Sequence, residues 1–271
     1  MPPLIPIDDP DDPRIAAFRD IRERDLVRRD HLFVAEGEVV LNVLARSPLC
    51  RPTTLLLLDS RVAALAPLLD ALAEDVPVHV APRIVIDRIV GFPLHRGILA
   101  LGRRVETPTP DDLLARLPAA RARVLVLVGI ANHDNMGGIL RNAAAFGADA
   151  VLIDHASCDP LYRKAIRVSV GGALVVPFAR LEVGRDPVEL MRAAGLEPVA
   201  LTPSGAERLA DLPDLPRAAL LFGTEGPGLP AATIARCRGI RIPMAGGFDS
   251  LNVATTSGIV LHHLAEQKSP R

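Results

Sequence analysis

Polar side chains set among glycines follow three apolar runs in the C-terminal half of the chain, at residues 135–142, 221–229 and 242–253. Each group falls where the sequence pattern predicts that a strand ends and a helix begins. In an open α/β sheet, loops of this kind lie beside one another at the carboxyl ends of the strands, where ligands bind. We therefore expect the three loops to build one composite site.

The first loop combines a helix start with a cation. Gly137 and Gly138 leave the backbone uncrowded, so N–H groups exposed at the start of a helix favour an anion. Asn135 is placed to cap that helix. Arg141 follows about one turn later, and its forked guanidinium suits a phosphate. The alternative interpretation is an ordinary capped helix that carries a surface arginine.

The second loop contains a pattern typical of dinucleotide binding. Residues 226–231 fit G-x-G-x-x-G/A, and Asp249 lies about 20 residues further on. However, Glu225 immediately before the glycines would repel a pyrophosphate, and two prolines remove N–H donors. A loop that presents carbonyls and a carboxylate is better suited to a neutral or cationic ligand. Glu225 is alternatively a structural anchor for backbone N–H groups.

The third loop places Ser250 and Asn252 around the start of the last predicted helix. Ser250 is a candidate cap for that helix, and Asn252 would sit in its first turn, able to hydrogen-bond across the site. Gly246 and Gly247 permit mobility or a close approach to a ligand.

The elements that must position these loops alternate between strands and helices. Val124–Gly129 is a continuous apolar run, typical of a strand buried on both faces. The alternation predicts a mainly parallel sheet with helices on both faces. We expect strands at 124–129, 150–153, 175–178, 198–201, 218–222 and 240–242, and helices at 137–146, 160–170, 187–194 and 251–266.

The chain divides on composition into two predicted domains. Residues 1–105 form a small α/β domain that begins with a helical stretch over 13–29. Residues 106–122 are rich in proline and threonine and suit a linker with a short helix over 111–117. Residues 123–271 then form the domain that carries the three loops.

Composition narrows the functional classes. No apolar stretch reaches the roughly 18 residues of a membrane span, and the N-terminus is unlike a signal peptide. The three cysteines, Cys50, Cys158 and Cys237, are widely spaced and form no CxxC pair, which argues against zinc. We expect a cytoplasmic protein without membrane or metal partners.

The net charge of −1 neither indicates nor excludes nucleic-acid binding, because phosphate contacts depend on local patches. Six arginines occur between Arg14 and Arg29, and shorter basic clusters lie at 95–104 and 163–167. The alternative is that these are solvated helix faces. With no tryptophan, one tyrosine and seven phenylalanines, a base-stacking RNA-binding sheet is not expected.

The three loops, in this order and at these spacings, resemble the three signature motifs of the SpoU/TrmH family, which comprises RNA 2′-O-ribose methyltransferases of the SPOUT superfamily. The similarity covers about 150 residues, Val124 to Glu266. The first domain more loosely resembles the ribosomal-protein-like RNA-binding domain that often precedes this catalytic domain, with residues 95–100 like its HxG-rich closing strand.

The resemblance implies a C-terminal trefoil knot, a homodimer, S-adenosylmethionine as the methyl donor, and RNA, either ribosomal or transfer, as the substrate. By motif position, the catalytic set is Asn135, Arg141, Glu225, Ser250 and Asn252. The implied donor-binding set is Thr202, Gly223, Ile242, Met244 and Leu251. Two departures from the family pattern are Asn132-His133-Asp134, where Asp-Pro-His often stands, and Thr256, where alanine is often found.

The family's account makes the arginine that matches Arg141 a general base, helped by a substrate phosphate. A guanidinium is effectively always protonated, so Arg141 is alternatively a phosphate clamp while another acceptor or water takes the proton. Three other functions remain as alternatives: an oxidoreductase using the 226–231 pattern, a non-catalytic RNA-binding protein, and a methyltransferase of the Rossmann type.

Overall fold

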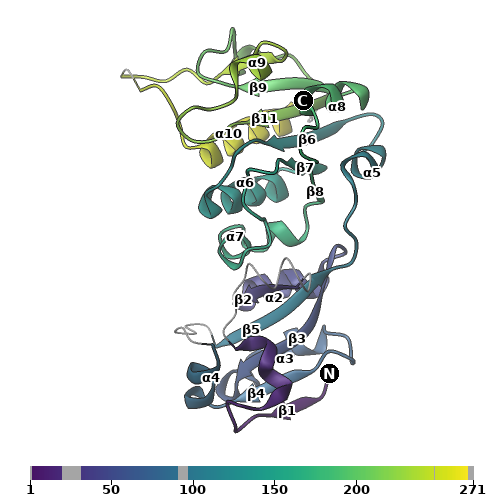
Figure 1. Ribbon diagram of the computed structural model, residues 1–271, viewed down its shortest axis with the longest axis vertical. Coiled ribbons are helices and arrows are strands. Elements are labelled where there is room, and N and C mark those ends of the chain that lie inside the picture. Colours follow the sequence, from purple (N-terminus) through teal and green to yellow (C-terminus); the bar gives the residue numbers. More distant parts are fainter. Residues whose placement is uncertain (1, 20–31, 91–96, 247, 268–271) are drawn as a thin grey trace. The chain divides into compact units, whose positions relative to one another are not determined.

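The structure is a computed structural model that describes residues 2–19, 32–90, 97–246 and 248–267. The chain forms two compact units (Figure 1). The first contains the chain up to Glu106 together with Leu161–Val175, and the second contains Thr107–Pro160 and the chain from Val176 onward. The segment 161–175 therefore packs with the first unit, although the sequence pattern alone assigns it to the second domain.

The first unit is built on a mixed five-stranded sheet in the order β1-β4-β3-β5-β2. β1, β4 and β3 are parallel, whereas β5 runs antiparallel to both of its neighbours. Its elements are β1 (Leu4–Pro6), η1 (Pro13–Phe18), β2 (Leu32–Glu36), α2 (Glu38–Arg46), β3 (Cys50–Leu58), η3 (Asp59–Arg61), α3 (Ala66–Asp70), β4 (Val78–Ala81), α4 (Arg83–Val90), β5 (Ile98–Arg104), α7 (Arg163–Val168) and η4 (Gly172–Leu174).

Only part of the predicted helix over 13–29 can be compared with the structure. Residues 13–18 form a 3₁₀ helix, η1, with a proline at its start, and Arg19 after it has an extended backbone. Residues 20–31, with Arg22, Arg24, Arg28 and Arg29, lie outside the described residues, as do His95 and Arg96.

The second unit is built on a seven-stranded, entirely parallel sheet in the order β10-β12-β9-β11-β6-β7-β8. This agrees with the predicted mainly parallel α/β fold. Its elements are α5 (Pro110–Ala115), β6 (Ala122–Leu127), α6 (His133–Ala145), β7 (Ala150–Ile153), β8 (Phe178–Arg180), α8 (Pro187–Ala193), β9 (Glu197–Leu201), β10 (Glu207–Arg208), η5 (Leu209–Asp211), β11 (Arg217–Phe222), α9 (Ala231–Ile234), β12 (Arg238–Arg241) and α10 (Val253–Glu266).

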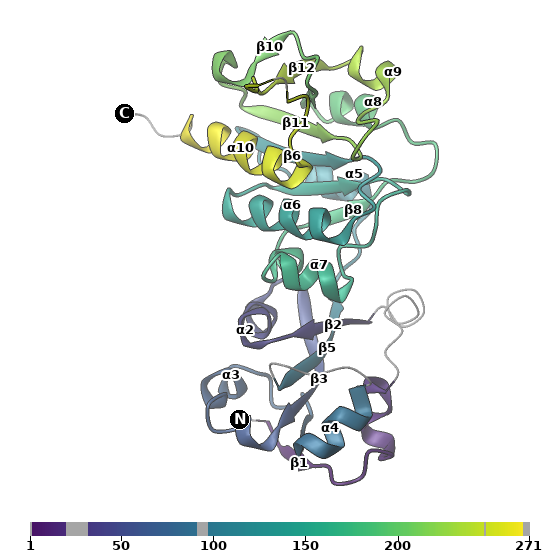
Figure 2. The same ribbon diagram turned by 90° about the vertical axis from the view of Figure 1, so that its left-hand side faces the viewer.

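Helices cover both faces of this sheet. Every residue of β6 is buried, and Val124 and Val126 belong to a core cluster with Leu113 of α5 and Met191 of α8. Because successive strand residues face opposite sides, Leu125 and its alternating neighbours face the other layer. That layer is α6 and α10, which lie side by side (Figure 2).

The predicted linker contains a helix that packs into the second unit. A proline at N1 and a reciprocal hydrogen-bond pair between Thr109 and Asp112 begin α5. Leu113 and Leu114 are buried in the core of the second unit. The sequence predicts this short helix but not its burial. Leu113 and Leu114 pack into the core, although composition alone assigns both residues to a linker.

Candidate active site

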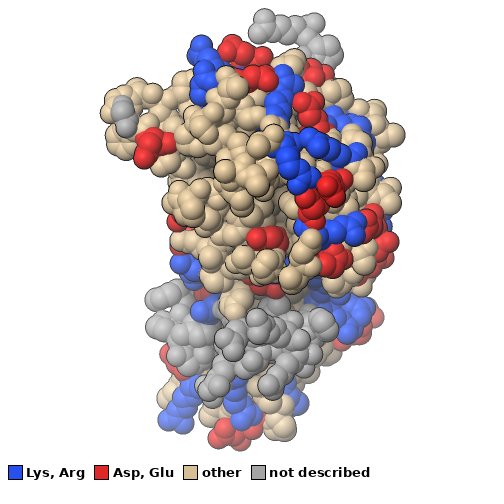
Figure 3. Space-filling model, turned by 45° about the horizontal axis from the view of Figure 1, so that its top comes forward, with Lys and Arg blue, Asp and Glu red and all other residues tan. Residues whose placement is uncertain are grey.

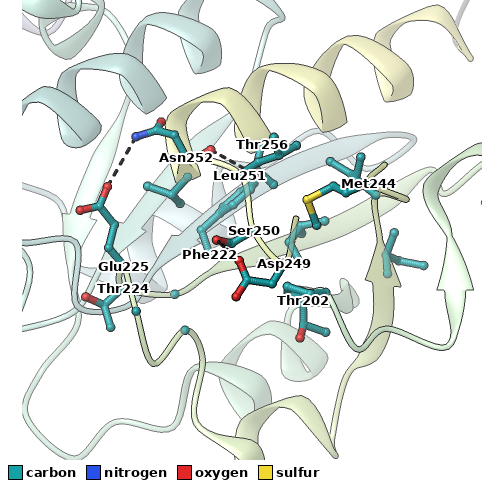
Figure 4. A pocket seen from close by; sticks show the side chains of 18 residues that line it. Thr202, Phe222, Thr224, Glu225, Met244, Asp249, Ser250, Leu251, Asn252 and Thr256 are labelled. Carbon is teal, nitrogen blue, oxygen red and sulfur yellow. Dashed lines mark hydrogen bonds between the residues drawn. The ribbon is translucent and has the colours of Figure 1, made fainter. Parts of the chain in front are cut away.

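A cavity of about 500 Å³ opens at the carboxyl ends of β9, β11 and β12, three neighbouring strands of the parallel sheet. Its volume falls within the usual range for small-molecule sites. The chain after each strand contributes to the wall, and the start of α10 completes it (Figure 4). The lining residues are 201–203, 222–226, 228, 240, 242, 244, 249–253 and 256. The second and third loops expected from the sequence therefore meet in one cavity.

The first loop joins the other two through hydrogen bonds among three side chains, here called the amide–carboxylate trio: Asn135, Glu225 and Asn252. Nδ2 of Asn135 donates to Oε1 of Glu225 at 2.5 Å, and Nδ2 of Asn252 donates to Oδ1 of Asn135 at 2.8 Å. Nδ2 of Asn252 is also 3.5 Å from Oε1 of Glu225. One residue from each loop thus belongs to the trio, so the three loops converge.

The helix starts at the site differ from the sequence prediction. α6 begins at His133 with Asn132 as its cap, so Asn135 is a buried residue of the first turn and not the cap. α10 is capped by Asn252, whose Oδ1 accepts from the N–H groups of Ala254 and Thr255, whereas Ser250 lies before it. In both segments several cap-forming residues stand close together, and propensity does not choose among them.

Gly138 supports helix packing and lies inside α6, contrary to the expected anion site at a helix start. A Cβ at Gly138 would lie 2.7 Å from the Cβ of Ala254 on α10. Beside this contact, Nδ2 of Asn142 donates to the carbonyl of Ala254 at 2.7 Å and to Oγ of Ser257 at 3.0 Å. The small residue lets α6 approach α10, and that approach brings Asn135 to Asn252.

Arg141 has a different environment from the trio. It lies on α6 and is exposed, and it makes no hydrogen bond or ion pair with any described residue. It is not among the residues that line the cavity. Six positions separate it from Asn135, which corresponds to about 9 Å along the helix axis. Its guanidinium is therefore available to a partner outside the chain.

All five residues predicted to bind the donor line the cavity: Thr202, Gly223, Ile242, Met244 and Leu251. Gly223 is the tightest position, because a Cβ there would lie 2.3 Å from the backbone nitrogen of Leu229. Any contact with a ligand at Gly223 must therefore come from the backbone. The apolar side chains of this set offer a surface for a flat apolar ring.

Several lining residues were not among the predicted site residues, and Asp249 and Thr256 are two polar examples. Asp249 is exposed in the cavity and accepts a hydrogen bond from Oγ of Ser250 at 3.2 Å. Thr256 lines the cavity from α10, and its hydroxyl donates to the carbonyl of Asn252 at 3.1 Å. In the sequence, Asp249 stands out only as the distal acid of the dinucleotide pattern, and Thr256 only as a departure from the family pattern.

The charges of the cavity indicate which ligands it can hold. Its lining contains two carboxylates, Glu225 and Asp249, and no lysine or arginine among the residues that the structure describes. Gly226 and Gly228 of the dinucleotide pattern line it, but α9 after them has four residues and Pro230 at its cap. The cavity thus suits a ligand with positive charge and apolar rings better than a pyrophosphate.

Two further kinds of functional feature are absent from the described residues, a membrane span and a metal-binding cluster. No described helix is long and apolar enough to cross a membrane. Within the described ranges, no cluster of three or more histidine, cysteine or acidic side chains could hold a metal ion.

The known proteins that this chain resembles are named as methyltransferases. An uncharacterized tRNA/rRNA methyltransferase of Mycobacterium tuberculosis is 41% identical over 268 residues, covering 94% of this chain and 89% of that protein. A crystal structure of an RNA 2′-O ribose methyltransferase matches with a TM-score of 0.77 at 25% identity, covering 97% of this chain and 99% of that one. The SpoU methyltransferase AviRb from Streptomyces viridochromogenes, solved with AdoMet, matches with a TM-score of 0.72 at 25% identity, covering 94% and 97%.

Residues 122–262 match the SpoU rRNA Methylase family. The matched range contains all three loops, the whole amide–carboxylate trio and Arg141. The chain therefore belongs to the SpoU rRNA methylase family.

Proposed function

We propose that this RNA methyltransferase transfers the methyl group of S-adenosylmethionine to a ribose 2′-hydroxyl in structured ribosomal or transfer RNA, acting in the cytoplasm. The observation that carries the proposal is the amide–carboxylate trio, which joins three loops beside one cavity. The names of two structural neighbours, one a 2′-O ribose methyltransferase and one solved with AdoMet, support the reaction and the donor.

The cavity fits the donor by its chemistry. S-adenosylmethionine combines an adenine ring, a ribose, and a methionine portion with a cationic sulfur. Ile242, Met244 and Leu251 would contact the ring, and the backbone at Gly223 would approach the ligand without a side chain between them. The carboxylates of the lining favour the positive charge. When bound, the donor supplies an electrophilic methyl group.

Methyl transfer to a hydroxyl requires alignment and removal of a proton. Alignment of two bound reactants contributes roughly 7–11 kcal/mol, and a rigid parallel sheet suits that task. The trio keeps the three loops in register, so its contribution is to position them. Ser250 and Asn252 would orient the ribose. Arg141, exposed and without a partner among the described residues, would hold the phosphate beside the target ribose.

RNA affinity is proposed to come partly from the first unit. Of the arginines between 14 and 29, Arg14 pairs with Asp12 and Arg19 with Asp11, while the others lie outside the described residues. On α7, Arg163 and Arg167 lie 3.9 and 3.7 Å from the buried carboxylate of Glu36. We expect RNA retention by the full chain to fall steeply between low and moderate salt. A flat response would contradict this role.

Two further family features complete the proposal. The C-terminal region would form a trefoil knot, and two copies of the chain would form a homodimer. Light scattering of the purified protein tests the second point, because a monomer at micromolar concentration would contradict it.

The position of the methyl group decides between this function and its alternatives. Purified protein is incubated with methyl-labelled S-adenosylmethionine and either ribosomal or transfer RNA, and the RNA is then hydrolysed with alkali. A 2′-O-methyl group blocks cleavage at its own nucleotide, so label in alkali-resistant dinucleotides supports the proposal. Label only in mononucleotides would indicate base methylation. Donor binding without transfer to any RNA would favour the non-catalytic alternative.

A further inference from the structure

The two carboxylates of the cavity differ in the hydrogen bonds that they accept from other residues of the chain. Glu225 accepts hydrogen bonds from the amides of Asn135 and Asn252. Asp249, by contrast, makes one polar contact with a described side chain, the hydroxyl of Ser250 at 3.2 Å. Figure 4 shows its carboxylate among the lining side chains, between Glu225 and Met244 in that view.

No positive charge of the described cavity wall compensates Asp249. Some arginines of this unit pair with carboxylates, such as Arg238 with Glu207 at 2.7 Å, but no described arginine forms an ion pair with Asp249. A carboxylate left without a cation in a concave site stabilises a cationic ligand more than a neutral ligand of the same shape. The donor and its product form such a pair, because loss of the methyl group converts a cationic sulfonium into a neutral thioether.

We propose that Asp249 is a specificity-determining residue that lets the cavity discriminate the sulfonium donor from its thioether product. This proposal rests on the proposed function. Its charge attracts the donor before transfer. That attraction ends once the methyl group has moved to the ribose oxygen and the sulfur has become neutral. Product release is thereby favoured without any change in the contacts to the adenine ring.

The test is the ratio of two dissociation constants measured by calorimetry on the full chain, S-adenosylhomocysteine over S-adenosylmethionine. Both ligands carry the same adenosine, ammonium and carboxylate groups. In Asp249→Asn, which keeps the shape and an acceptor for Ser250, this ratio should fall about tenfold through weaker donor binding. Binding of the product should change less than about twofold. Asp249→Glu should retain most of the ratio.

A matched control removes a carboxylate outside the cavity. Glu182 is exposed in the second unit and does not line the site, so Glu182→Gln should leave the ratio unchanged. The ratio of the wild-type protein should also fall as salt is added, since screening weakens an exposed charge.

Three outcomes would overturn the proposal. Equal weakening of both ligands in Asp249→Asn would mean that Asp249 shapes the loop or binds the shared ammonium group. Unchanged affinity for both ligands would remove it from donor selection. Binding of neither ligand by the wild-type protein would instead overturn the proposed function, and this proposal would fall with it.

Discussion

Asn135 of the amide–carboxylate trio and Arg141 lie on the same helix, α6, yet they occupy opposite environments. Asn135 is buried and bonded to both other members of the trio. Arg141, six residues later on the same helix, is exposed and unpaired among the described residues. The first arrangement forms hydrogen bonds within the chain. The second leaves a charge without a partner among the described residues.

Arg141 also differs from other arginines of the second unit. Arg236 lies 2.5 Å from Asp186 and 3.3 Å from Glu189, and Arg238 lies between Glu197 and Glu207. On the face drawn in Figure 3, blue and red side chains alternate along the right-hand side. In the second unit, the charges of Arg236 and Arg238 are met by carboxylates of the chain, whereas the charge of Arg141 is better placed to bind substrate.

The largest effect is expected from Arg141→Ala. Loss of a phosphate clamp should reduce kcat/KM for RNA by at least about 100-fold, with the donor dissociation constant nearly unchanged. The free energy of unfolding should change by less than about 0.5 kcal/mol, since Arg141 has no partner within the described chain. Initial rates of methylation give kcat/KM, calorimetry gives the donor dissociation constant, and urea denaturation gives the free energy of unfolding. Turnover comparable to that of the wild-type protein would remove Arg141 from the mechanism.

Arg141→Lys sharpens the same prediction. Lysine keeps the positive charge but cannot form two parallel hydrogen bonds with a phosphate. We expect partial recovery of kcat/KM. Full recovery would show that Arg141 acts only as a point charge.

In contrast to Arg141→Ala, substitution of a member of the trio should lower the free energy of unfolding. Asn252→Ala removes the cap of α10, which costs about 1 kcal/mol, and leaves Asn135 and Glu225 without a shared donor, which adds about 1 kcal/mol. The total loss in the free energy of unfolding should be about 2 kcal/mol, as measured by urea denaturation. Activity should also fall, because the loops lose their register.

Asn252→Ser separates the two contributions. Serine retains the ability to cap a helix but is too short to bridge the loops, so about half of the stability should return. Ser250→Ala serves as the neighbouring control and should change stability by less than about 0.5 kcal/mol. If Asn252→Ala were as stable as the wild-type protein, the hydrogen bonds of the trio would not stabilise the fold.

The convergence of the loops was predictable, because parallel strands place their carboxyl ends at one edge of a sheet. Val124–Gly129 and Ala218–Phe222 read as buried strands, and the structure pairs them as β6 and β11. The chemistry at their ends then follows from residue type. This is why Glu225 and Asn252 could be assigned to one site from the sequence.

What the sequence did not predict depends on tertiary packing. The sequence predicts Gly138 at a helix start. In the structure, glycine is required there because a side chain would collide with the Cβ of Ala254, 116 positions further along the chain. Apart from the dinucleotide pattern, nothing in the sequence distinguishes Asp249 from other acidic residues. Its significance comes from the cavity around it, whose described lining contains no lysine or arginine. The segment 161–175 reads as part of the second domain, and its packing with the first unit depends on contacts such as α7 against β2.

A paired arginine should give a smaller, purely structural effect. Arg236→Ala removes ion pairs to Asp186 and Glu189 at partly exposed positions, which costs about 0.2–1 kcal/mol in the free energy of unfolding. Methylation should be unchanged, since Arg236 does not line the cavity. Arg208→Ala, whose ion pair with Asp211 spans 3.9 Å, should cost less. A large loss of activity in Arg236→Ala would contradict the division between paired and unpaired arginines.

The same ion pair should make the Arg236→Ala effect depend on pH. The side chain of Arg236, followed by backbone N–H donors at the start of α8, lowers the pKa of Asp186 from its ordinary value of 3.8. A carboxyl whose pKa is lowered on folding contributes stability above the unfolded-state value, and this contribution is lost as the pH falls through the folded-state value. The stability difference between the wild-type protein and Arg236→Ala should therefore be full near pH 6 and shrink below about pH 4. Urea denaturation across this range measures it, and in an Asp186→Asn background most of the pH dependence should disappear. A difference that stays constant down to pH 3 would mean that Arg236 stabilises the protein through its other contacts and not through the charge of Asp186.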